Sequence, residues 1–205
     1  MQVTKFALIA GMTFGLLGCV PSSDRTANGT PALQPNSGQH AVIGPINVSK
    51  VSVTVPSSLK VSEAHRYYPF ADIVWRGEPV GNRYTQVAQI FKDAANRGTA
   101  AYKKGTAVTV DIEVARFHAV TETTRSSIGG VHSMRFFMTV KDAKTGRVID
   151  GPRYVIADTN AAGGERAINE DKAGRTQRVV VVERLAQVIQ NELAKLQSGT
   201  VVAGQ

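Results

Sequence analysis

Two histidines, His118 and His132, lie where the chain could bring them together. Each falls at the end of a run in which apolar and polar residues alternate, 106–119 and 131–141. If these runs form an antiparallel hairpin folded about Arg125, the two imidazoles face each other on one side of the sheet. Such a pair can bind a metal ion or act as a pH switch. A metal ion usually needs three or four ligands and no carboxylate is clearly aimed at the pair, so two histidines near solvent are the favoured interpretation.

Other residues that could support catalysis lack the surroundings that catalysis needs. The chain has no G-x-S-x-G motif for a nucleophilic serine. The glycine-rich stretch 126–130 joins two predicted strands, whereas a phosphate-binding loop enters a helix. The acidic pairs Asp111–Glu113 and Glu170–Asp171 fall on an outer strand face and in a polar loop, where solvated charges are expected. We therefore predict a protein that is not an enzyme and that has no metal or cofactor.

Aromatic and positively charged side chains give weaker indications. Tyr67, Tyr68, Phe70 and Trp75 cluster around a predicted loop and strand. They could form a surface for a ligand or partner, or they could pack in the core, which is the commoner role. The formal net charge is +8, but the positive side chains are scattered and few aromatics lie among them. This distribution argues against nucleic-acid binding.

Cys19 is the only cysteine, so it can form no disulfide within the chain and cannot complete a cysteine-based zinc site alone. It follows Lys5 and a run of twelve apolar or small residues, 6–17. A membrane-spanning helix needs about 20 residues, whereas a run of twelve has the length of a signal-peptide apolar region. The sequence therefore predicts export from the cytoplasm.

The residues Leu16-Leu17-Gly18-Cys19 resemble the lipobox of bacterial lipoproteins. The resemblance implies cleavage between Gly18 and Cys19, a diacylglycerol on the Cys19 sulfur and an acyl chain on its freed amine. Two or more acyl chains attach a protein stably to a membrane. Val20 stands where an aspartate retains many lipoproteins in the inner membrane, so the outer membrane is the expected location, with the inner membrane as the alternative. An ordinary secretory signal with an unrelated cysteine is the competing interpretation.

Composition divides the chain into a signal peptide, 1–18, the lipidated cysteine with a flexible linker, 19–46, a single periplasmic domain, 47–198, and a loose tail, 199–205. The linker is rich in Pro, Gly, Ser, Asn and Thr and shows neither helical nor strand periodicity. A flexible coil of its length has ends roughly 30 Å apart. Apolar residues make up 42% of the chain, which is enough for a core of useful size.

The domain reads as a mixture of strands and helices. Alternating valines predict a strand at 51–55, and a short apolar run predicts another at 71–76. Apolar residues at helical spacing predict helices at 84–97 and 174–197. A polar, glycine-rich loop is expected over 158–176.

The clearest pattern is the hairpin of 106–119 with 131–141. Folding about Arg125 places apolar side chains opposite one another: Val110 with Val140, Ile112 with Met138, and Val114 with Phe136. A third strand, 148–157, follows a turn and is interrupted by Gly151-Pro152, which fits an edge strand or a bulge. The predicted class is α+β, an antiparallel sheet with a three-strand meander and one face covered by two helices.

Parts of the chain resemble known lipoproteins. Residues 71–91 and 115–149 resemble a family of uncharacterised proteobacterial lipoproteins through R-F-H at 116–118, Gly-Gly-x-His at 129–132 and D-x-x-T-G at 142–146. That family implies no activity. The layout is also similar to that of the auxiliary lipoproteins of ABC-type lipid transporters, which are anchored in the outer membrane.

These observations favour a non-enzymatic, lipid-anchored envelope accessory that contacts the membrane through its anchor and docks to an envelope transport complex. Such a protein should present an exposed apolar or aromatic patch. The alternative is a periplasmic module that binds a small ligand or a metal through His118 and His132. That alternative requires the two rings to lie within coordination distance of each other and of a third ligand.

Overall fold

The structure, a computed structural model, describes residues 43–198. The predicted signal peptide, Cys19, nearly all of the predicted linker and the tail lie outside these residues. In chain order the elements are β1 (Ile46–Thr54), β2 (Ile73–Val74), α1 (Arg83–Gly98), β3 (Thr106–His118), α2 (Glu122–Arg125), β4 (Gly130–Asp142), β5 (Val148–Ile156), β6 (Thr159–Ala161), α3 (Gly164–Lys172) and α4 (Gln177–Ser198).

Strands β1, β3, β4 and β5 lie side by side in that order. The β3–β4 and β4–β5 pairs are antiparallel, which confirms the predicted three-strand meander. Strand β1 runs parallel to β3, so the prediction of a purely antiparallel sheet was wrong. A parallel pair needs a crossover connection, and the chain between β1 and β3 contains one in α1. The α+β class is confirmed, with a mixed sheet.

The β3–β4 hairpin has the predicted register over its first part, up to the pair Val114–Phe136. Beyond Val114 the register shifts by one residue, so Arg116 faces Arg135. Such a bulge places two residues of one strand opposite one residue of its partner. After the bulge, each side chain of β3 therefore points to the face of the sheet opposite to the one that an unbroken alternation predicts.

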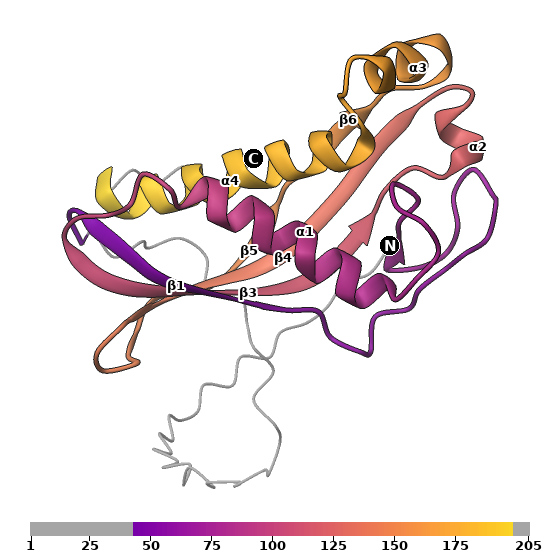
Figure 1. The fold of residues 1–205 in the computed structure, drawn as a ribbon. Helices are drawn as coiled ribbons and strands as arrows, with labels where there is room; N and C mark the ends of the chain where they lie inside the picture. The colour runs from indigo at the N-terminus through magenta and orange to yellow at the C-terminus, as the bar shows by residue number, and fades with distance from the viewer. Residues whose placement is uncertain (1–42, 199–205) are drawn as a thin grey trace, which may run out of the picture. The chain divides into compact units, whose positions relative to one another are not determined.

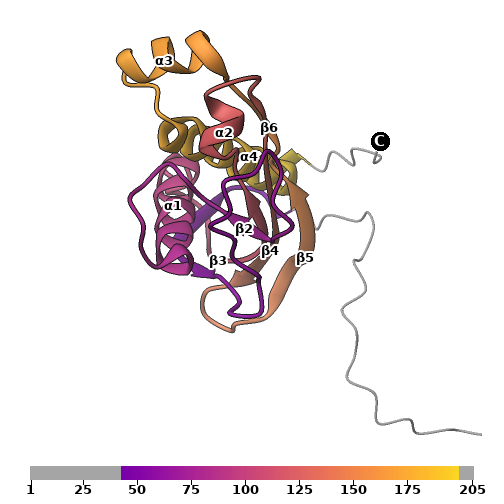
Figure 2. The same cartoon turned by 90° about the vertical axis from the view of Figure 1, so that its right-hand side faces the viewer.

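Helices α1 and α4 cover one face of the sheet, as predicted (Figure 1). The view turned by 90° shows the strands beside the helices (Figure 2). Helix α1 begins after Asn82, whose side chain accepts a hydrogen bond from the Thr85 amide. Its buried side chains recur at helical spacing and include Ile90 and Phe91. The Phe91 ring packs edge-on against Phe136 of β4, with ring centroids 5.5 Å apart.

The two helices approach closely at Gly98, the last residue of α1. A Cβ atom at this position would lie 2.6 Å from the carbonyl oxygen of Ala186 in α4 and 3.2 Å from Ile189 Cβ. Carbon and oxygen atoms that are not bonded do not come this close, so the helix contact depends on the absence of a side chain at Gly98.

Three segments differ from the sequence-based expectations because their local patterns are weak. The strand expected at 71–76 is reduced to the two residues of β2. The loop expected over 158–176 contains β6 and α3, and α3 buries only Ala167, so it has no apolar stripe from which a helix could be predicted. The folded part also begins before Asn47, because the Ile43 amide donates a hydrogen bond to the Leu196 carbonyl oxygen. Strand β5 is an edge strand with a bulge, as predicted.

Candidate interaction surface

The structure separates the two histidines that the sequence analysis pairs. Because of the bulge in β3, His118 faces Ser133, and His132 lies one position away on β4. Side chains alternate along a strand, so His118 points to the uncovered face of the sheet and His132 points to the side of the core residue Met134. Within residues 43–198 no group of three or more His, Cys, Asp or Glu side chains is placed to hold a metal ion. The predicted placement of the two histidines opposite each other was wrong, because the bulge reverses His118. The favoured expectation of two histidines near solvent was also wrong, because both side chains are buried.

Both histidines are buried, and burial is the main reason why the pKa of each falls to about 4. The nearby guanidinium of Arg116 lowers the pKa of His118 further, and that of Arg125 does the same for His132. Both rings are therefore neutral at pH 7. The His118 ring stacks on Tyr68, with centroids 4.4 Å apart, and its Nδ1 atom lies beside Arg116 Nη2.

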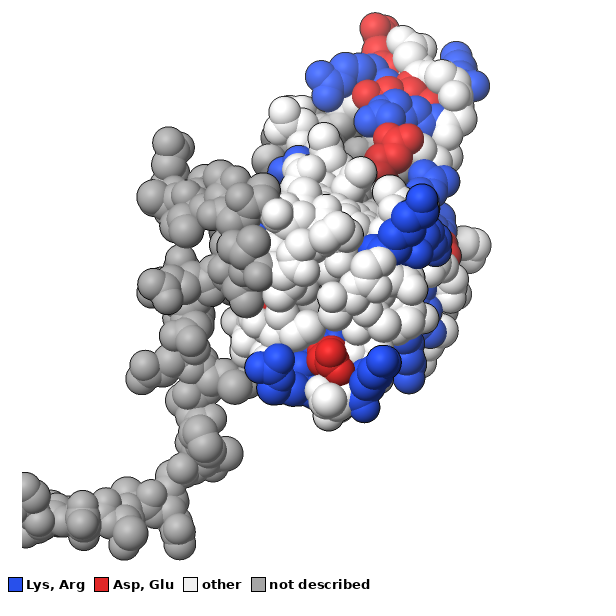
Figure 3. Space-filling view, turned by 90° about the vertical axis from the view of Figure 1, so that its left-hand side faces the viewer, with Lys and Arg blue, Asp and Glu red and all other residues white. Residues whose placement is uncertain are grey.

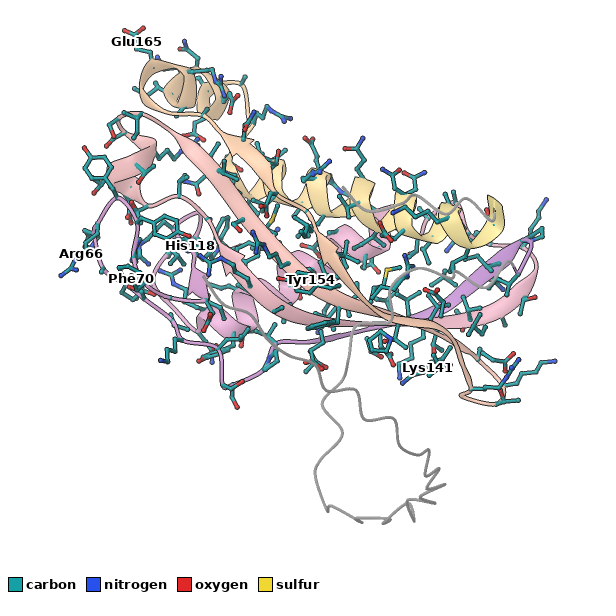
Figure 4. The ribbon with its side chains drawn as sticks, turned by 180° about the vertical axis from the view of Figure 1, so that it is seen from behind. Arg66, Phe70, His118, Lys141, Tyr154 and Glu165 are labelled. Carbon is teal, nitrogen blue, oxygen red and sulfur yellow. The ribbon has the colours of Figure 1, made fainter. Side chains whose placement is uncertain are left out.

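The uncovered face of the sheet carries apolar side chains that no helix covers within residues 43–198. Phe137 of β4 lies beside Tyr154 of β5, with ring centroids 5.2 Å apart. The next cross-strand pair on this face is Arg135 with Ile156. Tyr154 is 44% exposed and Ile156 is 54% exposed. We call Phe137, Tyr154, Ile156 and Arg135 the aromatic face; Tyr154 is labelled in Figure 4, which views the sheet from this side.

Two arginines stand opposite each other at the edge of the aromatic face. Arg116 of β3 faces Arg135 of β4. Like charges directly opposite on neighbouring strands are destabilising. Arg116 donates a hydrogen bond to the Tyr68 hydroxyl at 2.8 Å, and Arg135 lies 3.6 Å from an Asp158 carboxylate oxygen. The exposed Glu113 lies opposite Phe137 on the same face, so the aromatic rings have both positive and negative side chains beside them.

The other end of the same face is different, because its charges compensate each other. Asp111 of β3 forms an ion pair with Lys141 of β4 at 2.6 Å. The sequence analysis placed Asp111 on an outer strand face, and its ion pair with Lys141 lies there. The aromatic face is therefore confined to the part of the sheet near β5 and the end of β3.

A loop at the end of β3 adds three further aromatic side chains. Tyr67, Tyr68 and Phe70 are all exposed, whereas Trp75 is fully buried in the core. The sequence did not decide whether these four aromatic side chains lie at the surface or in the core. The structure places three of them at the surface and Trp75 in the core. We call residues 66–70 the aromatic loop. Phe70 and His118 are labelled near the same end of the sheet in Figure 4.

An ion-pair network supports the base of this loop. Arg83, which is buried, donates hydrogen bonds to both carboxylate oxygens of Glu63 at 2.7 and 3.1 Å. Arg76 also pairs with Glu63 and, at 3.2 Å, with Glu122. The hydrogen bond from Arg83 is the largest cause that holds the pKa of Glu63 below its ordinary value. These residues come from distant parts of the sequence, so no local pattern could have predicted the network.

The remaining candidates for chemistry have structural partners. Asp171 pairs with Arg125 at 2.7 Å, and Glu170 lies 3.9 Å from Arg166. The glycine-rich stretch 126–130 follows the short helix α2 and packs against the start of α3. A Cβ atom on Gly163 would lie only 1.9 Å from the Gly129 nitrogen, so the two backbones touch. This stretch therefore packs against another backbone segment instead of holding an anion at a helix terminus.

A cavity of about 430 Å³ lies between α2, α3 and the start of α4. Its lining includes Arg76, Glu122, Arg125, Asp171 and Gln177. The charges of the first four compensate in pairs, because Arg76 contacts Glu122 and Arg125 contacts Asp171. A cavity with balanced charge gives no preference for an anion or a cation, and the site therefore defines no ligand class.

Figure 3 shows a face whose centre is free of Lys, Arg, Asp and Glu and whose margin carries mainly positive side chains. Both charges mix on the projecting part that carries α3. The aromatic face thus differs from the surroundings of α3, where acidic and basic side chains alternate along the chain.

One sequence signal for the aromatic face was present. Phe137 occupies a position on the polar side of β4, between Arg135 and Thr139, where alternation expects a polar residue. A single aromatic side chain at a solvent-facing position is common, so this signal alone does not identify a contact surface. The sequence could not show that Tyr154 and Ile156 share the face of Phe137, because the bulge in β5 determines the direction of their side chains.

The fold and this surface define the molecule as a small α+β domain that covers one face of its sheet with helices and leaves an aromatic, arginine-flanked surface on the other. Residues 46–203 match a family of unknown function, DUF6778, and the chain belongs to this family. No curated protein matches the chain significantly.

Three solved structures are similar to the chain. A candidate lipoprotein from Caulobacter crescentus CB15 is 14% identical, with a TM-score of 0.35 over 73% of this chain and 92% of that one. A Xanthomonas campestris protein of the DUF330 family is 12% identical, with a TM-score of 0.41 over 78% and 87%. A minor lipoprotein from Acinetobacter baumannii is 14% identical, with a TM-score of 0.30 over 74% and 94%. At these TM-scores the likeness carries no functional conclusion.

Proposed function

We propose that this protein is a non-enzymatic, lipid-anchored accessory domain of the bacterial cell envelope. The anchor would be the acylated Cys19, and the outer membrane would be its site, because Val20 replaces the aspartate of inner-membrane lipoproteins. Among the described helices none is long and apolar enough to cross a membrane. The lipobox-like segment 16–19 is the feature that supports attachment.

The single observation that carries the docking role is the aromatic face. Tyr154 and Ile156 are exposed, Phe137 beside them is half-buried, and Arg116 stands next to Arg135 at the edge of the face. Aromatic residues and arginine are the side chains that dominate the energy of protein interfaces. We propose that this face docks to an envelope transport complex.

The test is a crosslinked pull-down of the full-length, C-terminally tagged chain from membranes. We expect one envelope component to be captured reproducibly by the native chain. The double variant Tyr154→Ala/Ile156→Ala should lower its recovery about tenfold or more, because removal of central interface side chains typically costs about 2 kcal/mol or more. The matched control is Val148→Ala, which removes an exposed apolar side chain from the far end of β5.

Two results would contradict the proposal. Equal recovery with the double variant and with Val148→Ala would show that the aromatic face does not dock. The anchor is tested separately by the intact mass of the membrane-extracted protein. We expect a mature chain that starts at Cys19 with a diacylglycerol and one acyl chain, and an unmodified cysteine would contradict the anchor. The Cys19→Ser variant should lose both the mass increment and the capture.

A further inference from the structure

We propose that the aromatic loop, residues 66–70, is a contact site for an anionic lipid bilayer, separate from the aromatic face. The inference rests on the proposed lipid anchor, which would keep the domain near a membrane. Figure 4 labels Arg66 and Phe70 together at one margin of the molecule, away from Lys141.

The loop exposes its apolar surface at a tip. Phe70 is 97% exposed, and Tyr67 and Tyr68 are each more than half exposed. Three exposed aromatic rings within four residues are far from the usual scatter of single apolar side chains on a soluble surface. The Phe70 ring makes almost no contact with the rest of the domain, so nearly its whole apolar surface is free to enter an apolar layer.

The loop is held in this conformation from its inner side. The hydroxyl of Thr121 donates a hydrogen bond to the Arg66 carbonyl oxygen, and the hydroxyl of Thr124 donates one to the Tyr67 carbonyl oxygen, each at 2.7 Å. Both threonines are buried, and Pro69 next to them is buried as well. The backbone is thus tied to the domain while the Phe70 ring stays outside the core. A preformed tip loses less conformational entropy on binding than a flexible one.

Positive charge surrounds the tip. Lys60 and Arg66 are exposed, and within residues 43–198 neither forms an ion pair. Lys60 lines a shallow hollow of about 410 Å³ together with Tyr68, Phe70 and Arg116. Asp72 lines the same hollow and keeps its negative charge while it accepts a hydrogen bond from the Lys60 amide, whereas Glu63 pairs with two arginines. With Lys60, Arg66 and Arg116 against Asp72, the surroundings of the loop carry a net positive charge beside the aromatic rings.

This combination has the chemistry of a bilayer interface. Tyrosine rings prefer the headgroup level, where the ring is in an apolar layer and the hydroxyl is hydrated. Phenylalanine enters the layer beneath, and exposed Lys and Arg gain from anionic headgroups. A flexible coil of the length of residues 20–42 would have ends roughly 25–30 Å apart on average. The loop would then be held close enough to the anchoring membrane for a weak contact to orient the domain.

The experiment uses the chain from Val20 onward, which keeps every described residue and lacks Cys19, so binding reports the domain alone. The Phe70→Trp variant is mixed with phosphatidylglycerol-containing vesicles and with phosphatidylcholine vesicles. The native Trp75 is fully buried and contributes a constant signal. With anionic vesicles we expect a blue shift of the emission from the tryptophan introduced by this substitution, and quenching of that emission by brominated lipid. A spectrum unchanged by either vesicle would overturn the inference.

Vesicle sedimentation of further variants separates the contributions. Phe70→Ala should weaken binding to anionic vesicles about tenfold, because an aromatic ring loses its apolar contact. The double variant Lys60→Gln/Arg66→Gln should weaken binding to anionic vesicles by more than about tenfold, because each cation contributes about fivefold. Binding to phosphatidylcholine vesicles should not change. The control Val148→Ala removes an exposed apolar side chain from the strand next to Lys141, at the other end of the sheet, and should bind as the native chain does.

Two further results would contradict the inference and leave the proposed function unaffected. Native-like vesicle binding by Phe70→Ala would show that the loop does not enter the interface. Loss of binding with Val148→Ala to the same degree would show that the effect is not specific to the loop. The proposed anchor is tested by the mass at Cys19, and the proposed docking role is tested by the capture with Tyr154→Ala/Ile156→Ala. A failure of the inference can therefore be distinguished from a failure of the proposed function.

Discussion

On the helix-covered face of the sheet, Phe136 has no exposed surface and packs against Phe91 of α1. Its neighbour in sequence, Phe137, points the other way, is half-buried and packs against Tyr154, which is 44% exposed. The same residue type thus supports the core on one face and a surface on the other. Phe137 and Tyr154 lie outside the hydrophobic core, and the proposed docking role rests on them.

The largest effect should come from this adjacent pair. Phe136→Ala removes a ring from the core and should lower the free energy of unfolding by about 3–5 kcal/mol. Phe137→Ala removes the same atoms from the uncovered face and should cost about 1 kcal/mol or less. Urea unfolding followed by circular dichroism measures both. Equal losses would contradict the assignment of the two faces.

The pH dependence of stability tests one histidine on each face. His118 and His132 have pKa values of about 4 in the folded protein, against 6.5 for the unperturbed group. Between these values the unfolded chain binds more protons, so the free energy of unfolding falls as the pH is lowered from 6.5 towards 4. Each histidine contributes a slope of up to about 1.4 kcal/mol per pH unit. His118→Gln and His132→Gln should each reduce the slope, and an unchanged slope in either would contradict its burial.

The close contact between the helices predicts a smaller loss. Gly98→Ala places a Cβ atom against the Ala186 carbonyl oxygen and should lower the free energy of unfolding by about 1–3 kcal/mol. The control is Gly146→Ala, where a Cβ atom has open space but the backbone has a φ of +71°. That variant should lose about 1 kcal/mol, from backbone strain alone. Thermal unfolding of both variants measures the two losses of stability, one from a steric clash and the other from backbone strain.

The smallest effect on stability should come from the docking variant. Tyr154 and Ile156 are exposed, so Tyr154→Ala/Ile156→Ala should change the free energy of unfolding by about 1 kcal/mol or less. Urea unfolding checks this value, and the result decides how the capture experiment is interpreted. A loss of several kcal/mol would mean that the two side chains belong to the fold and are not available for a partner.

Much of the fold could be predicted because its signals are local. The apolar pairs that end at Val114 and Phe136 specified the first part of the hairpin register, and helical spacing specified α1 and α4. The bulge after Val114 did leave a mark, because Arg116 and Phe117 exchange the polar and apolar positions of the alternation, but the predicted register continued past it and so misplaced His118. The parallel placement of β1 depends on a distant strand, so no nearby residue indicated it. The aromatic face combines strand positions across two bulges, which explains why only Phe137 gave a sequence signal.

The most direct test of the central claim is site-specific photocrosslinking in cells with the full-length chain. A photoreactive amino acid replaces either Tyr154 on the aromatic face or Gln187, which is exposed on α4. We predict adducts with one envelope component from position 154 and none from position 187. Adducts from position 187 alone, or the same adducts from both positions, would contradict docking through the aromatic face.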